Sequence, residues 1–253
     1  MTLKTSLAAA SLLSLSVLSI SVLSGCQNFD TQGLMSAGTQ ALQVATISDS
    51  DVKTLSDKSC AEMDAQAKLA PANSPYTTRL NKIADSLGYS VNGTALNYKV
   101  YLTSEVNAWA MANGCVRVYS GLMDKMTDNE IQGVVGHEIG HVALGHSKHA
   151  MQIAYSAEIA RGAIASAAGG VIASLTQSQL GDIAEQFVNA QFSQKQELAA
   201  DNYSFDMLSK KGISPAGLAT AFDKLGGGEA TLLSSHPSSS ARAQNIRSKL
   251  AAQ

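Results

Sequence analysis

Two histidines and one glutamate near the middle of the chain have the residue types and spacing of a metal-dependent hydrolytic site. His137 and His141 are four residues apart, so on a helix both imidazoles can face one Zn²⁺ ion. Glu138 lies beside them and is placed to take a proton from the metal-activated water that attacks a peptide carbonyl. The same short pattern also occurs by chance on surface helices. Here a capping box precedes it, and burying these polar side chains without a metal would be costly.

Such a site needs a third protein ligand and one open position for water. Glu197 is the candidate, because Glu197 and Asp201 share a helical face and the aspartate can accept the second ring proton of a ligating histidine. A pair of solvated charges on a helix is the alternative interpretation. A downstream histidine fits less well, since Gly145 and His146 are each displaced by one residue from the spacing that another class of zinc enzymes uses. We therefore expect His146 and His149 to be solvated polar residues.

The elements that would position these residues are mainly helical. A Thr-Asp-Asn-Glu capping box followed by apolar residues at helical spacing predicts a helix over residues 128–146, which carries both histidines. A second helical pattern covers residues 182–210 and carries Glu197. A last helix is expected over residues 239–252.

A small sheet is expected beside these helices. A helical pattern over residues 52–87, broken by two prolines, ends at Gly88 in the manner of a helix C-cap. Residues 98–102 then alternate like a strand. The pair Asn113-Gly114 suits a tight turn between the strand-like segments 108–112 and 116–119. The sequence therefore predicts an α+β fold, mainly helical, with a small antiparallel sheet flanking the helix of the two histidines.

Length and composition allow one catalytic domain with one sizeable core. The chain has 253 residues, of which 45% are hydrophobic and 15% charged. Aromatic residues are scarce while Ala, Ser and Gly are abundant, so helices must pack through small residues at close approach. The formal net charge of −2 provides no field that would gather nucleic acid or anionic lipid, and we expect no nucleic-acid partner.

The first 25 residues have the layout of a bacterial lipoprotein signal peptide. Lys4 precedes an uncharged, Leu-rich run that ends in Leu-Ser-Gly before Cys26, an order that resembles a lipobox. Cleavage before Cys26 and acylation of that residue would anchor the protein to a membrane. An uncleaved membrane anchor is the alternative, because the run is about as long as a short span.

The residue after Cys26 indicates to which membrane the lipoprotein would be sorted. In a Gram-negative source, Gln27 in place of an aspartate implies the outer membrane, with the protein facing the periplasm. We expect residues 1–25 to be the signal peptide, residues 26–50 a lipid-attached tether, and residues 51–253 the catalytic domain.

Two cysteines remain once Cys26 carries lipid. In the oxidising periplasm Cys60 and Cys115 allow a single intramolecular pair, so we expect a disulfide between them. Two unrelated buried thiols are the alternative, because this pairing is inferred only by elimination.

The two central motifs together resemble a known family. His-Glu-x-x-His at residues 137–141 joined to Glu197-x-x-x-Asp201 is similar to the zinc metallopeptidases that include the CAAX prenyl protease and HtpX. Three further segments extend the resemblance over roughly residues 60–250: Asn107-Ala108-Trp109-Ala110, Tyr119 to Met123, and His236-Pro237 followed by Arg242. The resemblance implies a zincin-like (gluzincin) fold and one Zn²⁺ per chain.

The resemblance also implies roles for these outlying segments. Residues 107–110 would be the sheet edge beside the zinc, to which an extended substrate adds as another strand. A plain core strand is the alternative. His236 would approach the metal and either stabilise the oxyanion or occlude the site, and we favour the catalytic role because an imidazole is a suitable donor near neutral pH. Arg242 would orient its segment by pairing with a carboxylate.

The expected function is a zinc-dependent endopeptidase that cleaves unfolded or misassembled envelope proteins. Its partners would be those substrates, the membrane through the lipid anchor, and an outer-membrane assembly or protease partner. The alternative is an outer-membrane chaperone or assembly factor with a latent or structural zinc site. An intact Glu138 favours catalysis, because a structural site needs no general base.

Overall fold

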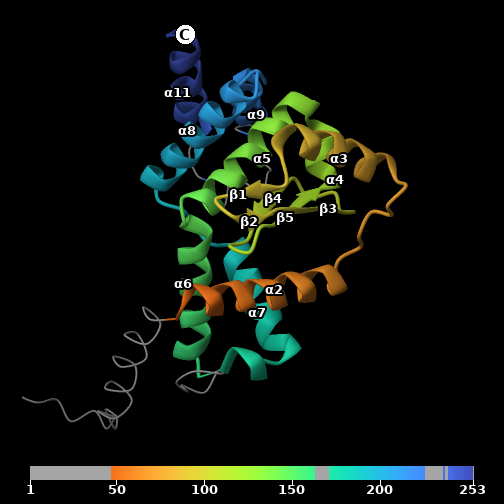
Figure 1. Cartoon of the computed structure of the whole chain (residues 1–253), viewed down its shortest axis with the longest axis vertical. Coiled ribbons are helices and arrows are strands. Elements are labelled where there is room, and N and C mark those ends of the chain that lie inside the picture. The colour runs from red at the N-terminus through yellow and green to blue at the C-terminus, as the bar shows by residue number, and fades with distance from the viewer. Residues whose placement is uncertain (1–46, 163–170, 226–235, 237–238, 253) are drawn as a thin grey trace, which may run out of the picture.

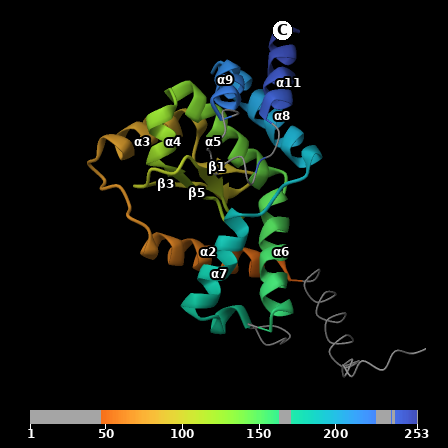
Figure 2. The same ribbon diagram turned by 180° about the vertical axis from the view of Figure 1, so that it is seen from behind.

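The computed structural model describes residues 47–162, 171–225, 236 and 239–252. The expected signal peptide, Cys26 and nearly all of the expected tether lie outside the described residues. The main sheet has three strands. Figure 1 shows helices above and below this sheet, and Figure 2 shows the same arrangement from behind.

A central helix, α5 (Asp128–Ala143), organises the upper part of the molecule. It begins at the predicted capping box, where the Thr127 side chain and Glu130 each accept the other's backbone N–H. It packs against α8 (Gln194–Lys210) and α9 (Ala216–Leu225), and α11 (Ser239–Ala251) packs on those two helices.

The sheet has the strand order β3-β5-β4. β4 (Ala108–Ala110) runs antiparallel to β5 (Cys115–Tyr119), as the Asn-Gly turn predicted, with Gly114 at φ 83°. β3 (Asn97–Tyr101) instead runs parallel to β5, which lies between β3 and β4. The chain runs back along β4 first and then enters β5 in the direction of β3. The small sheet is therefore mixed. A two-stranded ribbon, β1 (Ser90–Val91) and β2 (Thr94–Ala95), precedes it.

Both faces of the sheet are covered, and the side chains alternate between two apolar clusters. Val100, Val116 and Val118 belong to the cluster that contains α5, α9 and α3 (Pro75–Leu87). Tyr101 and Trp109 belong to a second cluster with α2 (Asp49–Gln66), α6 (His146–Ala160) and α7 (Gln177–Val188). This alternation is the two-residue period of a strand buried on both sides.

Two helix boundaries differ from the sequence expectation. The pattern over residues 182–210 is not one helix, because α7 ends at Val188 and a new capping box at Ser193 starts α8. The first histidine helix ends at Ala143, and Gly145 at φ 75° redirects the chain into α6. Only glycine adopts this left-handed conformation without a steric penalty. The proline-broken pattern over residues 52–87 is confirmed as α2 and α3, with Gly88 as the C-cap of α3.

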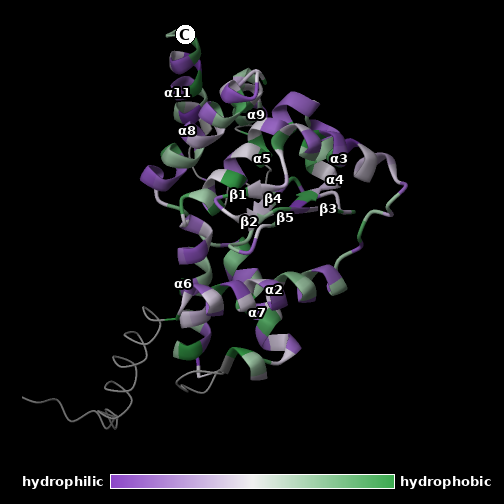
Figure 3. Ribbon diagram, viewed as in Figure 1, coloured by the Kyte–Doolittle hydropathy of each residue, from purple (hydrophilic) through white to green (hydrophobic). Residues whose placement is uncertain are grey.

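The remaining described elements are short. α4 (Ser120–Lys125) follows β5 directly, and a 3₁₀ turn, η1 (Val171–Ser174), precedes α7. Within the described residues, no helix has the length and apolar character needed to cross a membrane. Figure 3 shows hydrophilic and hydrophobic residues mixed along the helices.

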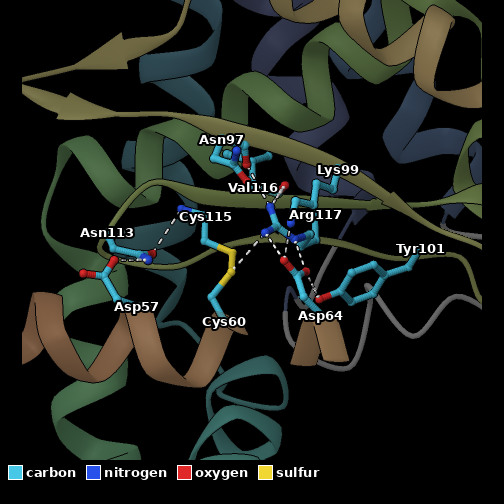
Figure 4. Close-up of a disulfide and its surroundings, with 10 residues drawn as sticks. All are labelled: Asp57, Cys60, Asp64, Asn97, Lys99, Tyr101, Asn113, Cys115, Val116 and Arg117. Carbon is cyan, nitrogen blue, oxygen red and sulfur yellow. Dashed lines mark hydrogen bonds and ion pairs between the residues drawn. A yellow bond between two sulfur atoms is a disulfide. The ribbon is translucent and has the colours of Figure 1, made fainter. Parts of the chain in front are cut away.

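A disulfide and a buried ion pair fasten α2 to the sheet. Cys60 on α2 is bonded to Cys115 on β5, as predicted. The Arg117 guanidinium, almost fully buried, donates to both carboxylate oxygens of Asp64 at 2.7 and 2.8 Å and contacts the Cys60 sulfur at 3.1 Å. Lys99 also donates to Asp64, at 2.7 Å. Figure 4 shows the disulfide and these polar contacts side by side.

Candidate metal centre

The two motif histidines lie buried on one face of α5. Their Nε2 atoms are 3.0 Å apart. Glu197, in the first turn of α8, places Oε2 3.6 Å from His137 Nε2 and Oε1 3.4 Å from His141 Nε2. The three residues that the sequence analysis assigned as ligands therefore converge from two helices on one point.

Close packing of α8 and α9 on α5 makes this convergence possible. A methyl group at Gly136 would lie 2.6 Å from the Ser204 hydroxyl, and one at Gly140 would lie 3.0 Å from the Ala200 carbonyl oxygen. Gly133 is in similar contact with the α9 backbone. These glycines carry out the small-residue packing that the composition suggested, and they bring the Glu197 side chain within reach of the histidines.

His236 joins the same cluster. One ligand atom from each of His137, His141, Glu197 and His236 can be chosen so that all four lie within 4.8 Å of one another. His236 Nδ1 is 2.9 Å from Glu197 Oε1, and its Nε2 is 3.6 Å from Glu138 Oε1. His236 therefore lies beside the three expected ligands, at the position the sequence analysis expected it to approach.

Asp201 and Arg242 surround the ligands. Asp201 Oδ1 is 2.8 Å from His137 Nδ1, the ring nitrogen that faces away from His141. Arg242 lies 2.6 Å from Glu197 Oε2 and donates to both oxygens of Asp201, at 2.6 and 2.8 Å. The guanidinium also lies over the Phe222 ring. Arg242 therefore holds two carboxylates and joins α11 to α8.

Glu138 is buried next to the cluster without ligating geometry of its own. Within the described part of the chain, its Oε1 has no hydrogen-bond partner. Burial raises the pKa of Glu138 to about 7. A buried carboxylate oxygen without a hydrogen-bond partner costs free energy, which indicates that a water, an ion or a substrate group completes this site.

Burial also keeps the ligating histidines neutral. It lowers the pKa of His141 to about 4 and, together with the nearby Arg242 charge, lowers that of His137. The neutral imidazole is the form that binds a metal. For His236, burial opposes the charged form, but the carboxylates of Glu138 and Glu197 outweigh it and raise the pKa.

The donor set fits a divalent cation. Two neutral imidazoles and one carboxylate are the ligand types of a hydrolytic zinc site. Three buried carboxylates, Glu138, Glu197 and Asp201, face one guanidinium, Arg242, so with the carboxylates ionised and the imidazoles neutral the site carries an excess of two negative charges. A bound divalent ion would neutralise this excess negative charge.

Two aromatic residues at the site were missed or misassigned in the sequence. His146 is not solvated as expected: it is half-buried, and its Nδ1 lies 3.1 Å from Nδ1 of His141. Phe192, just before α8, packs its ring 3.9 Å from the His141 ring and 5.4 Å from the His236 ring. No local pattern marks Phe192, because the break between α7 and α8 places it there. His149 is exposed, as expected.

The segment expected to bind substrate forms the edge strand β4 and is buried. Asn107, Ala108, Trp109 and Ala110 are each at most 5% exposed. The Ala110 carbonyl accepts a hydrogen bond from the Ser147 hydroxyl at 2.8 Å, and the Ala108 N–H donates to the Asn107 side chain at 2.9 Å. Trp109 points into the second apolar cluster against Phe187.

A cavity of about 750 Å³ opens beside the cluster. Its size falls in the usual range of ligand sites. His146 and Phe192 lie at the side of the cavity nearest the ligands, and α6 and α7 provide its walls through Ile153 and Gln186 among others. The cavity therefore reaches the side chains that surround His141.

Comparison with known proteins agrees with this geometry. Residues 73–250 match Peptidase family M48. The metalloprotease LoiP of Escherichia coli strain K12 is 56% identical over 233 residues, which cover 90% of this chain and 92% of the relative. The metalloprotease YcaL of the same organism is 54% identical over 235 residues, with the same coverage of each chain.

A more distant relative is larger. The beta-barrel assembly-enhancing protease of Yersinia pestis is 27% identical over 235 residues, which cover 85% of this chain and 46% of that protein. The match to the family spans well over half of the chain, and the buried histidines and glutamates lie within it. This chain therefore belongs to peptidase family M48 and is a metalloendopeptidase.

Proposed function

We propose that this chain is a zinc endopeptidase that cleaves unfolded or misassembled proteins of the bacterial envelope. One observation carries the proposal. The buried cluster of His137, His141 and Glu197 has the Glu138 carboxylate beside it, and one oxygen of that carboxylate has no partner in the described part of the chain. Ligands alone would suffice for a structural ion, whereas a carboxylate beside them supplies the proton acceptor that metal-assisted hydrolysis of a peptide bond uses.

The side chains divide the chemistry as follows. His137, His141 and Glu197 would hold one Zn²⁺, which when bound polarises a peptide carbonyl and makes water more acidic. Glu138 accepts the proton of the attacking water and delivers it to the leaving amine. Asp201 accepts the Nδ1 proton of His137, so that Nε2 carries no proton and its lone pair is available to the metal.

Arg242 and His236 complete the proposed mechanism. Arg242 fixes the Glu197 and Asp201 carboxylates relative to each other through its ion pairs. His236 donates a hydrogen bond to the oxyanion that forms from the carbonyl oxygen when water adds to the carbonyl carbon. In the structure His236 lies among the ligands, so four protein groups can surround the metal position. That closed set is typical of a structural or latent site, and catalysis requires His236 to yield one position to water and substrate.

The substrate would bind as an extended segment along β4. In the register with β5, the backbone groups of Ala108 and Ala110 face away from β5. The Ala108 N–H and the Ala110 carbonyl already bond to Asn107 and Ser147, so the Ala108 carbonyl and the Ala110 N–H would be the groups offered to a substrate strand. Addition of a strand needs a polypeptide without structure of its own, which supports unfolded proteins as substrates. The cavity beside His146 and Phe192 would receive side chains of the same segment.

We further propose that a lipid on Cys26 holds the enzyme at the periplasmic face of the outer membrane. The lipobox-like sequence before Cys26 and Gln27 after it support this location. Partners would be the misassembled envelope proteins themselves and an outer-membrane assembly or protease partner. The relative named for beta-barrel assembly supports that kind of partner.

The deciding experiment is digestion of casein or another unfolded protein by the purified mature chain. We expect cleavage, its loss with a metal chelator, and its recovery when zinc is added back. Folded proteins of similar size should resist. A chain that binds zinc but cleaves no unfolded protein under any of these conditions would instead support a latent site in an assembly factor.

A further inference from the structure

The two ligating histidines are held by different partners, and only one of these partners belongs to the known motifs. His137 presents Nδ1 to the Asp201 carboxylate at 2.8 Å. His141 presents its Nδ1 to a second imidazole, that of His146, at 3.1 Å. The Nε2 atom of His141 points the other way, 3.0 Å from His137 Nε2 and 3.4 Å from Glu197 Oε1.

The chemistry of a ligating histidine settles which ring donates. A neutral imidazole that offers Nε2 to a metal carries its proton on Nδ1. His141 must therefore be the donor in the contact between the two rings, and His146 Nδ1 must be the acceptor, with its own proton on Nε2. We propose that His146 is a positioning residue that fixes the tautomer and ring orientation of the metal ligand His141.

The backbone explains how His146 reaches this place. On an unbroken helix a residue five positions after His141 would point about 140° away from it. The helix ends at Ala143, and Gly145 in the left-handed region turns the chain so that His146 becomes the first residue of α6. The Phe192 ring covers the face of His141, so the imidazole is held at its edge by His146 and over its face by Phe192.

The test is the zinc dissociation constant of matched variants, measured by competition with a chromophoric chelator. In His146→Asn the side-chain oxygen takes nearly the place of the imidazole Nδ1 and keeps an acceptor. His146→Leu has the same shape as the asparagine without any acceptor. We expect the leucine variant to bind zinc about 10–100-fold more weakly than wild type, and the asparagine variant to stay within about threefold.

His149→Leu is the control, because His149 lines the same cavity but is exposed and, within the described part of the chain, contacts none of the proposed metal ligands. Its zinc affinity should not change. Circular dichroism of the metal-free proteins verifies that the variants fold. Wild-type zinc affinity in His146→Leu would overturn the proposal, and so would an equal loss in His146→Leu and His146→Asn, since that pattern indicates packing alone.

A second measurement needs no variant that could misfold. In the zinc-loaded wild-type protein, ¹⁵N NMR of the imidazoles should show the proton of His146 on Nε2 and that of His141 on Nδ1. A His146 ring with its proton on Nδ1 would contradict the proposed direction of the hydrogen bond. The role of His146 rests on the zinc site of the proposed function. Relative zinc affinities test that role whether or not the chain cleaves protein, so the role of His146 and the endopeptidase activity can fail separately.

Discussion

Burial decides the chemistry of individual side chains in this site. The same exclusion of water that keeps His137 and His141 neutral raises the pKa of Glu138 to about 7. A carboxyl group with that pKa accepts and returns protons readily near neutral pH. Burial thus lowers the pKa of the two proposed histidine ligands and raises that of the proposed proton acceptor, because it disfavours the charged form of each.

Replacing Glu138 by glutamine should separate metal binding from catalysis. The amide keeps the size of the side chain and leaves His137, His141 and Glu197 untouched, but it cannot take up a proton. We expect Glu138→Gln to retain one zinc per chain and to lose at least about 10²-fold in kcat. Metal analysis beside a peptidase assay measures both quantities, and a variant that cleaves at the wild-type rate would rule out the proton-accepting role.

His236 tests whether the fourth group at the metal position assists or blocks the reaction. If it donates to the oxyanion, His236→Ala should lower kcat by about 10²–10³ while zinc content stays near one per chain, because three ligands remain. We expect this result. Steady-state kinetics on an unfolded substrate measures it. A rise in kcat would assign His236 as a plug, and unchanged kcat and KM would remove it from the mechanism.

At the scale of elements, helix contact distance determines whether the ligands meet. His137 and Glu197 lie on different helices, and their side chains converge because glycines let α8 and α9 approach the α5 backbone. A larger side chain in place of one of these glycines would push the helices apart. The site therefore depends on residues that carry no functional group.

Gly133→Ala should expose this dependence. The added methyl would lie 2.7 Å from the Leu218 Cα, which is backbone and cannot rotate away. We expect a loss of about 1–3 kcal/mol in the free energy of unfolding. Gly181→Ala is the matched control in another helix, where the nearest atom is the flexible Gln66 amide at 3.5 Å, and there the better helix propensity should add up to about 1 kcal/mol. Urea denaturation measures the free energy of unfolding of both variants. Equal changes in Gly133→Ala and Gly181→Ala would contradict the proposed close packing at Gly133.

At the scale of the whole molecule, the sheet separates two apolar clusters that must be kept together. The upper cluster contains α5, α9 and α3, and the lower one contains α2, α6 and α7. The disulfide and the Asp64–Arg117 ion pair join α2 to β5 across this boundary. α6 begins in the upper part at His146 and continues into the lower cluster, so it also connects the two.

Removing the disulfide should destabilise the entire chain. Cys60 and Cys115 are separated by 55 residues, and closing such a loop stabilises the folded state by about 4 kcal/mol through the entropy of the unfolded chain. We expect the Cys60→Ser, Cys115→Ser double variant to lose free energy of unfolding by that order in urea titrations. Alkylation of the protein, isolated after export as proposed and kept under non-reducing denaturing conditions, should find neither thiol free, and finding both free would refute the bond.

The proposed lipid anchor on Cys26 can be tested by fractionation. Cys26→Ala removes the thiol that acylation requires, so we expect it to abolish fatty-acid labelling and to release the protein from membranes. The catalytic cluster lies more than 100 residues along the chain, so peptidase activity of the released protein should remain. A Cys26→Ala protein that is still labelled and membrane-bound would exclude lipidation at this residue.

Much of this architecture follows from local patterns. The capping box set the start of α5, the two prolines separated α2 from α3, and Asn113-Gly114 marked the turn between β4 and β5. The spacing of His137, Glu138 and His141 on one helix indicated the metal, and the elimination of Cys26 left a single disulfide, which the structure contains. Each of these features depends on residues a few positions apart or, for the disulfide, on the number of cysteines. The sequence alone therefore determined them.

Tertiary structure decided what depends on where separate segments meet. The parallel pairing of β3 with β5 and the placement of Phe192 over His141 have no local signal. His146 was misassigned because helical periodicity was extended through Gly145, where the chain leaves the helix. Side-chain direction can be calculated from spacing only while the backbone repeats. Once the backbone turns, long-range packing alone determines which ring nitrogen faces which.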